Sequence, residues 1–223
     1  DIPFSVRAAA RPVHVEHFEV EPREVQATLY VVSNVWSQRA EYARLRRIFR
    51  AQFSRLALVQ ADWRFAFITM DGSGAPARDA NLTPWFELRD VDPVAEFDAR
   101  WPHIGAVAGP QLGLHSAMSF LQTHPDFAGQ AQTLRVIFAT DRDDASADID
   151  TLVPQLRALA SAVYVMGVTG GPSGCDEGGW DAQPAPRFAR FATEHVRWCD
   201  ELEPTIQGPV VSPARRARAY PLR

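Results

Sequence analysis

The sequence predicts an α/β protein with a doubly wound, mostly parallel sheet that has helices on both faces. Two predicted strands, at residues 26–32 and 134–140, contain the uninterrupted apolar runs 29–32 and 136–139, which are typical of strands buried on both sides. Segments with apolar residues at three- and four-residue spacing lie between the strand-like runs. Because the two kinds of segment alternate several times, we expect parallel strands joined by crossover helices, in a Rossmann-like three-layer sandwich.

Length and composition favour one domain. The chain has 223 residues, of which 46% are hydrophobic and 22% charged, and these are ordinary values for a folded domain. We expect a flexible arm at 1–12, a globular body at 13–212 and a basic tail at 213–223. A net charge of −4 gives no reason to expect nucleic acid, and no apolar run is long enough to predict a membrane span. Since the first residue is Asp1 rather than Met, we expect a processed or trimmed form.

The first third of the chain predicts an edge strand at 13–20, a buried strand at 26–32 and a long helix at 38–58. The helix has an apolar stripe, and its arginines lie mostly off that stripe. These residues are Arg39, Arg44, Arg46, Arg47, Arg50 and Arg55. This basic face either binds an anionic partner or is simply solvated, as charged residues are on the polar face of any amphipathic helix.

A second strand is predicted at 63–70, and an irregular stretch follows it at 72–104. This stretch contains the large aromatic residues Trp85, Phe86, Phe97 and Trp101. They either form an exposed recognition surface or pin a long loop onto the body, because large aromatic residues are usually mostly buried.

The second half of the chain repeats the alternation. We expect a helix from Pro110 to Thr123, a strand at 134–140, a helix at 148–161 and a strand at 163–168. A final helix at 187–198 and an edge strand at 204–212 complete the predicted fold.

Polar residues follow two of the predicted central strands. In a parallel sheet the carboxyl ends of these strands meet at one edge, where α/β proteins bind ligands. The residues concerned are Ser33, Asn34, Ser37, Asp141, Asp143 and Asp144. Hydroxyl and carboxylate oxygens suit Mg²⁺ or Ca²⁺. Asp143 and Asp144 are most simply interpreted as solvated acids of a loop.

The sequence offers little for enzyme chemistry. It contains no Gly-x-Ser-x-Gly, no phosphate-binding loop, no His-Glu-x-x-His and no dinucleotide fingerprint. His115 is a single histidine without a recognisable partner, whereas catalysis requires an oriented constellation. We therefore predict a protein that is not an enzyme. The alternative is a metal-dependent hydrolase or phosphatase that uses Asp141 and Asp143.

Several motifs resemble the von Willebrand factor A-type (vWA) domain, in particular that of bacterial secreted proteins. Residues 33–37, Ser-Asn-Val-Trp-Ser, stand where that family has Asp-x-Ser-x-Ser after a strand. Residues 136–146, Val-Ile-Phe-Ala-Thr-Asp-Arg-Asp-Asp-Ala-Ser, are similar to the family's Val-Ile-Phe-Val-Ser-Asp-Glu-Asp-Asp-x-Ser. Residues 109–114 resemble the start of the helix that follows the family's middle metal loop.

The resemblance implies a divalent-metal adhesion site, but two of its residues are replaced. Ser33 stands for the leading Asp, and Val35 for the middle Ser. Since Mg²⁺ usually needs one or two carboxylates, we expect a degenerate site without a tightly held metal. A weak Mg²⁺ or Ca²⁺ contact through Ser37 and Asp141 is the most that the remaining residues suggest.

The resemblance also implies a function. Members of the family mediate protein–protein contacts, so we expect a protein partner bound by the loops at the carboxyl edge. Trp36 belongs to these loops, and aromatic residues are enriched at the centres of interfaces. Alternatively, Trp36 fills the space left by the metal, or the chain is a structural subunit of a cell-envelope assembly.

The two cysteines, Cys175 and Cys199, are free thiols in a reducing compartment and can form one bridge in an oxidising one. They resemble a late cysteine pair of the same extracytoplasmic vWA group. The resemblance therefore implies a disulfide and a periplasmic, secreted or cell-surface location.

Overall fold

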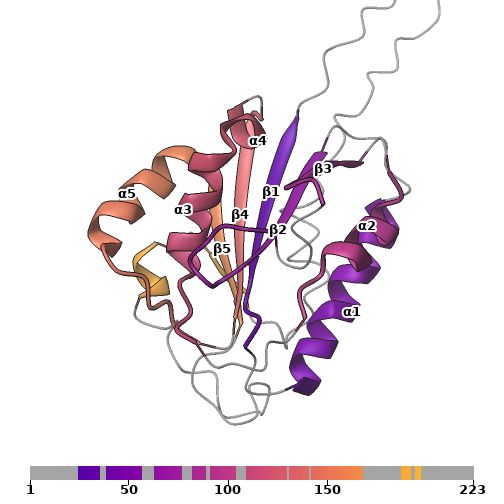
Figure 1. Cartoon of the computed structure of the whole chain (residues 1–223), viewed down its shortest axis with the longest axis horizontal. Coiled ribbons are helices and arrows are strands. Elements are labelled where there is room, and N and C mark those ends of the chain that lie inside the picture. Colours follow the sequence, from indigo (N-terminus) through magenta and orange to yellow (C-terminus); the bar gives the residue numbers. More distant parts are fainter. Residues whose placement is uncertain are drawn as a thin grey trace, which may run out of the picture.

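A computed structural model of the chain contains a six-stranded sheet between two layers of helices (Figure 1). The structure describes residues 25–35, 39–56, 63–76, 82–88, 91–103, 109–129, 131–140, 142–167, 187–191 and 194–196. The sheet has the order β3-β2-β1-β4-β5-β6. Strands β2, β1, β4, β5 and β6 run parallel to one another, and β3 is antiparallel to its neighbour β2. The predicted fold class is therefore confirmed.

The elements follow the predicted alternation closely. The strands are β1 (Gln26–Val32), β2 (Trp63–Thr69), β3 (Phe86–Glu87), β4 (Thr133–Thr140), β5 (Ala162–Gly167) and β6 (Glu194–Val196). The helices are α1 (Arg39–Leu56), α2 (Pro93–Arg100), α3 (Gly113–Thr123), α4 (Pro125–Gly129), α5 (Ile149–Leu159) and the 3₁₀ helix η2 (Phe188–Arg190). None of the helices in the described ranges has the length and apolar character needed to cross a bilayer.

Strands β1 and β4 lie side by side in the middle of the sheet, as their apolar sequences predict. Every residue of β1 is buried. Leu29 pairs with Ala66 of β2 on one side and with Val136 of β4 on the other. A strand in this position is covered by helices on both faces, which explains why even its polar residues Gln26 and Thr28 are buried.

Helices α1 and α2 cover one face of the sheet through an aromatic core. Tyr30 of β1 stacks on Phe67 of β2 with ring centroids 4.8 Å apart, and Phe53 of α1 packs on Phe97 of α2 at 5.3 Å. The buried stripe of α1 consists of Tyr42, Leu45, Phe49 and Phe53. The apolar residues that recur at three- and four-residue spacing in the sequence thus form the face of α1 that packs against the sheet.

Three aromatic residues of the irregular stretch belong to this core, whereas the fourth, Trp85, packs against the core of the opposite face. Phe86, Phe97 and Trp101 are buried, and Trp85 is half-buried. They pin residues 82–88 and 91–103 onto the sheet, so the alternative of an exposed recognition surface is wrong for these side chains. Helix α2, which the sequence did not predict, begins where the Asp92 carboxylate accepts hydrogen bonds from two backbone N–H groups of its first turn.

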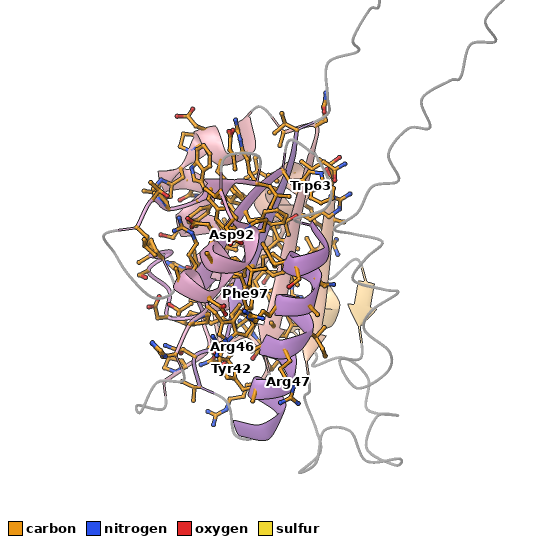
Figure 2. The ribbon with its side chains drawn as sticks, turned by 90° about the vertical axis from the view of Figure 1, so that its right-hand side faces the viewer. Tyr42, Arg46, Arg47, Trp63, Asp92 and Phe97 are labelled. Carbon is orange, nitrogen blue, oxygen red and sulfur yellow. The ribbon has the colours of Figure 1, made fainter. Side chains whose placement is uncertain are left out.

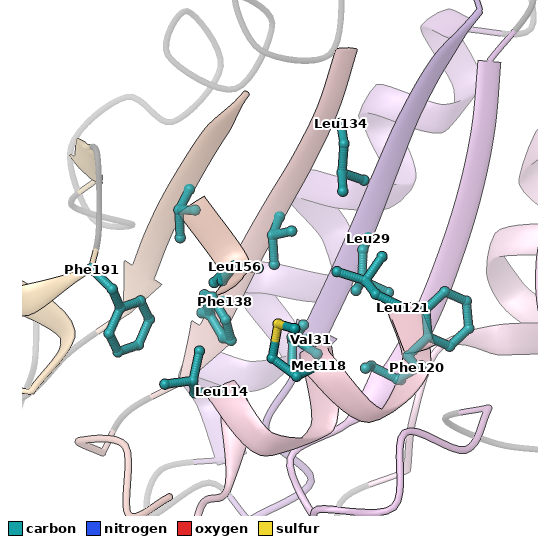
Figure 3. Packing of buried hydrophobic residues seen from close by; sticks show 14 of the residues in the cluster. Leu29, Val31, Leu114, Met118, Phe120, Leu121, Leu134, Phe138, Leu156 and Phe191 are labelled. Carbon is teal, nitrogen blue, oxygen red and sulfur yellow. The ribbon is translucent and has the colours of Figure 1, made fainter. Parts of the chain in front are cut away.

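Helices α3, α4 and α5 cover the opposite face with a mainly aliphatic core (Figure 3). Leu114, Met118 and Leu121 of α3 pack with Leu29 and Val31 of β1 in this cluster. Figure 1 shows α3 and α5 on one side of the sheet and α1 and α2 on the other, which completes the three layers.

One predicted element is wrong. Instead of a helix at 187–198, the chain forms the short helix η2 and then the edge strand β6. Phe188 and Phe191 are both fully buried, and their rings lie 5.6 and 5.4 Å from that of Phe138. The three-residue spacing of two anchors suits a 3₁₀ turn, and pairing with β5 then extends the chain. The predicted arm, tail and edge strands at 13–20 and 204–212 lie outside the described residues, as do Cys175 and Cys199.

Candidate functional site

The carboxyl edge of the sheet brings the ends of β1 and β4 together, as the sequence predicts. Val32 pairs with Ala139, and the Ser33 N–H donates to the Ala139 carbonyl at 2.8 Å. Ser33 therefore lies beside Thr140, the last residue of β4. The predicted site residues Trp36, Ser37 and Asp141 are outside the described part of the chain.

Both strands end in the same kind of hydroxyl turn. The Ser33 hydroxyl donates to the Val35 carbonyl at 3.0 Å and accepts from the Val35 N–H at 3.2 Å. The Thr140 hydroxyl makes the matching pair of bonds with the backbone of Arg142, at 3.1 and 3.0 Å. These two hydroxyls form hydrogen bonds with backbone groups just beyond the ends of β1 and β4. The Ser33 hydroxyl therefore has a structural role. Asn34 is half-buried in the first of these turns.

Asp144 caps helix α3 from a distant loop. Its Oδ1 accepts from the Leu114 N–H and the Ser146 hydroxyl, both at 3.0 Å, and its Oδ2 accepts from the Ser146 N–H at 3.2 Å. Ser146 also accepts from the His115 N–H at 3.0 Å. Leu112, at the N-cap position, has no side chain able to accept these bonds, so the cap comes from elsewhere. The interpretation of Asp144 as a solvated acid is wrong, because the residue is only 1% exposed.

The environment of Asp144 shifts its acidity. Burial raises the pKa of the Asp144 carboxyl above its ordinary value, because a charged group is less stable away from water. The hydrogen bonds from Leu114 and Ser146 and the positive charge of Arg187 act in the opposite direction without cancelling the effect of burial. The contribution of Asp144 to the free energy of unfolding therefore depends on pH.

Asp143 holds the chain segment that contains η2. Its Oδ1 accepts from the Phe188 N–H at 3.3 Å and from the Asp144 N–H at 2.9 Å, and its Oδ2 accepts from the Arg187 N–H at 3.2 Å. The Arg187 guanidinium donates to the carbonyl of Ser146. The half-buried Asp143 is thus part of the framework and not simply a solvated acid.

Helix α3 also fixes the loop that follows β2. The Gly72 N–H donates to the Ser116 hydroxyl at 2.8 Å, and the Ser119 hydroxyl donates to the Ser73 carbonyl at 2.9 Å. Gly74 has φ +71°, and a Cβ atom there would lie 2.6 Å from the backbone nitrogen of Phe120. Only glycine allows this close approach. One helix therefore positions two loops of the carboxyl edge.

The described residues of this edge do not fit a metal site by themselves. The Ser33 hydroxyl donates to and accepts from the backbone of Val35, and the carboxylates of Asp143 and Asp144 accept from protein donors, whereas Mg²⁺ requires oxygens arranged in octahedral geometry. Within the described ranges, no group of three or more His, Cys, Asp or Glu side chains is placed to hold a metal ion. The predicted contribution of Ser37 and Asp141 stays a prediction.

Three residues of the edge escaped the sequence analysis. Ser146 completes the cap of α3, and Arg187 ties η2 to the same loop. The third is the buried Gln111, whose backbone carbonyl accepts from the Ala145 N–H at 2.6 Å and whose side-chain oxygen has no partner within the described ranges. The sequence contained one signal for this arrangement, since no capping residue precedes Gly113. The predicted His115 is exposed beside this loop.

Comparison with known proteins supports the fold and goes no further. No family model and no curated protein matches the chain. A second crystal form of proximal thread matrix protein 1 from the mussel byssus is similar, with a TM-score of 0.51 and 15% identity over 86% of this chain. Another structure of that matrix protein matches 66% of this chain, with a TM-score of 0.45 and 14% identity. This chain spans 49% and 37% of those two chains, less than half of their length. The second crystal form shares the α/β fold, and the present arrangement of layers is consistent with a vWA-like three-layer sandwich.

Proposed function

We propose that this chain is a non-enzymatic, extracytoplasmic protein-binding or adhesion module with a vWA-like fold and a largely lost metal site. The observation that supports this most is the use of Asp143 and Asp144. Both carboxylates accept hydrogen bonds from backbone N–H groups and thereby hold α3 and η2 in place. Acids used in this way build a fixed surface, whereas a catalytic acid or metal ligand needs access to substrate or ion.

The contact surface in this proposal is the carboxyl edge. Helix α3 fixes the loops on either side of it, and a preorganised surface loses little conformational freedom when a partner binds. Asp71, His115 and Arg142 are exposed there and supply polar contacts. Trp36 is the proposed central anchor. The byssus protein of similar fold is named a matrix protein, which is compatible with a structural or adhesive role.

The second candidate, a metal-dependent hydrolase that uses Asp141 and Asp143, needs a different state of the edge. Asp143 would have to release the backbone of Arg187 and Phe188 before it could bind a metal. Hydrolysis of p-nitrophenyl phosphate by the purified chain, dependent on Mg²⁺ or Mn²⁺ and lost in Asp141→Ala, would favour this candidate over a binding module.

Cross-linking from the two ends of β4 tests the proposed surface. A photo-reactive amino acid replaces Arg142, at the carboxyl edge, or Gln132, which is exposed at the opposite edge. In the native organism we expect the position-142 variant to form one dominant protein adduct that the matched position-132 variant does not form. Equal adducts from both positions, or none from position 142, would contradict the assignment of the edge.

The proposed location rests on Cys175 and Cys199. If the two form a disulfide, denatured but unreduced protein purified from its native source has no reactive thiol. Closing a loop of roughly two dozen residues stabilises the fold by about 3 kcal/mol in the chain-entropy model, and a reducing agent removes that gain. Two titratable thiols per chain would remove the support for an extracytoplasmic location.

A further inference from the structure

Helix α1 concentrates the basic charge of an acidic chain. It contains six of the 23 arginines but only one of the 27 acidic residues, Glu41. Arg46, Arg47 and Arg50 are exposed on its outer surface. Figure 2 looks onto this surface and shows Arg46 on the side of α1 near α2, with Arg47 farther from α2. Charge segregated in this way attracts a partner of opposite sign.

An internal carboxylate already occupies part of this surface. Asp98 of α2 accepts from Arg46 Nη2 at 3.0 Å and from Arg50 Nε at 3.0 Å, so guanidinium groups from successive turns of α1 converge on one carboxylate. The side chains of Arg46 and Arg50 are 46% and 51% exposed, and that of Asp98 is 33% exposed. Exposed ion pairs contribute little to stability, so another carboxylate can replace Asp98 at small cost.

The rest of the outer surface is suited to contact with an extended chain. Ala43, Ala51 and Ser54 are exposed and small, so a partner's backbone can approach the helix between the arginines. Arg47 forms no ion pair with any residue in the described ranges. Arg47 and Arg50 lie one helical turn apart, the spacing at which side chains are neighbours on a helix.

We propose that the outer face of α1 is a second interaction surface, which binds an acidic protein segment. The partner's carboxylates replace Asp98 on Arg46 and Arg50 and bind Arg47 in addition. Asp98 is the observation that favours a carboxylate, since it shows how these arginines bind one. This surface is separate from the carboxyl edge, and the proposal does not depend on the function assigned to that edge.

Fluorescence anisotropy with a labelled decaglutamate peptide tests the proposal on the full chain. We expect binding that weakens as salt is added, because exposed charges are screened. Arg47→Gln and Arg50→Gln should each weaken binding about threefold, the size expected for one exposed ion pair. Asp98→Asn should strengthen binding, because it removes the competing charge. Arg157→Gln, an equal change of charge on the exposed surface of α5, is the matched control and should leave the affinity unchanged.

Four results would overturn the proposal. They are failure of the wild-type chain to bind the peptide, an equal loss in Arg157→Gln, weaker binding in Asp98→Asn, and binding of heparin without binding of decaglutamate. The last result would assign the surface to a sulfated polysaccharide. Arg47→Gln breaks no ion pair among the described residues. Weaker peptide binding by this variant therefore reports the lost positive charge and not the loss of an internal ion pair.

Discussion

The two faces of the sheet are built differently. The face under α1 and α2 is packed with aromatic rings, and three of its residues, Tyr30, Gln52 and Trp101, have buried polar atoms with no hydrogen-bond partner among the described residues. On the face under α3 and α5 the packing is mainly aliphatic, and the unpaired buried atoms lie only at its edge, in Gln111 and Arg187, as far as the structure describes it. Buried polar groups normally have hydrogen-bond partners. The unpaired atoms therefore lower the stability of the first face more than that of the second.

The difference indicates a division of labour. Aromatic residues bury large areas, and the first face therefore contributes mainly to stability. The second face carries the hydrogen bonds that place the loops of the carboxyl edge, through Asp144, Ser116 and Ser119. We therefore expect changes on the first face to lower the free energy of unfolding, and changes on the second to alter the geometry of the edge.

The largest expected effect is on the aromatic face. Phe53→Ala removes a fully buried ring that packs on Tyr30, Phe65 and Phe97. A deletion of this size costs about 3–5 kcal/mol of the free energy of unfolding, measured by urea denaturation. Cross-linking from position 142 should persist below the melting temperature. A loss under about 1 kcal/mol would show that this face is not the main source of stability.

The second effect is on the cap of α3. Asp144→Ala should cost about 1–2 kcal/mol of unfolding free energy, because it removes a helix cap and leaves buried donors unpaired. Hydrogen exchange should accelerate at the amides of Leu114 and Ser146, while amides of α1 remain protected. Uniform acceleration across both faces would contradict the proposed division.

The same residue makes stability depend on pH. Because the pKa of folded Asp144 is raised, its contribution is fully present below the ordinary pKa of about 4 and is lost as the pH rises through the raised value. Asp144→Asn should remove this dependence, which denaturation of both proteins across acidic pH would measure. An identical pH profile in the two proteins would show that the carboxyl does not titrate differently after folding.

A smaller effect of opposite sign is expected from Gln52, which is only 4% exposed and whose side-chain amide finds no partner in the part of the chain that the structure describes. Gln52→Leu should raise the unfolding free energy by about 1 kcal/mol, because it replaces unpaired polar atoms with apolar ones of similar size. The exposed Ser54→Leu on the same helix is the control and should change stability little. A loss of stability in Gln52→Leu would mean that the amide has a role on this face.

The smallest expected effect is that of added metal. Calorimetric titration with Mg²⁺, Mn²⁺ or Ca²⁺ should show no binding at micromolar concentration. The reason is that Ser33 stands where the vWA motif has an Asp, and Val35 stands where it has a Ser. The double change Ser33→Asp and Val35→Ser should restore some affinity if the edge keeps the family's frame. Micromolar binding by the wild-type chain, abolished by Asp141→Ala, would contradict the prediction.

The sequence predicted the elements whose evidence is local. The apolar runs 29–32 and 136–139 placed β1 and β4 in the centre, and the spacing of Tyr42, Leu45 and Phe49 gave the buried side of α1. It did not reveal that Asp144 caps a helix 30 residues earlier in the chain, since such a bond leaves no periodic pattern. The final helix was wrong for the same reason, because burial of Phe188 against Phe138 is a long-range contact.

The adjacent acids Asp143 and Asp144 hold two segments far apart in the chain, one on either side of their loop. Surface loops usually tolerate insertions and deletions. Here, one residue added or removed between β4 and Asp143 would shift both carboxylates out of register with α3 and with residues 187–188 at once. Evolution or design can therefore vary the composition of this loop more easily than its length. A chimaeric protein that contains the Asp143–Asp144 loop must therefore also contain α3 and the η2 segment from the same parent protein.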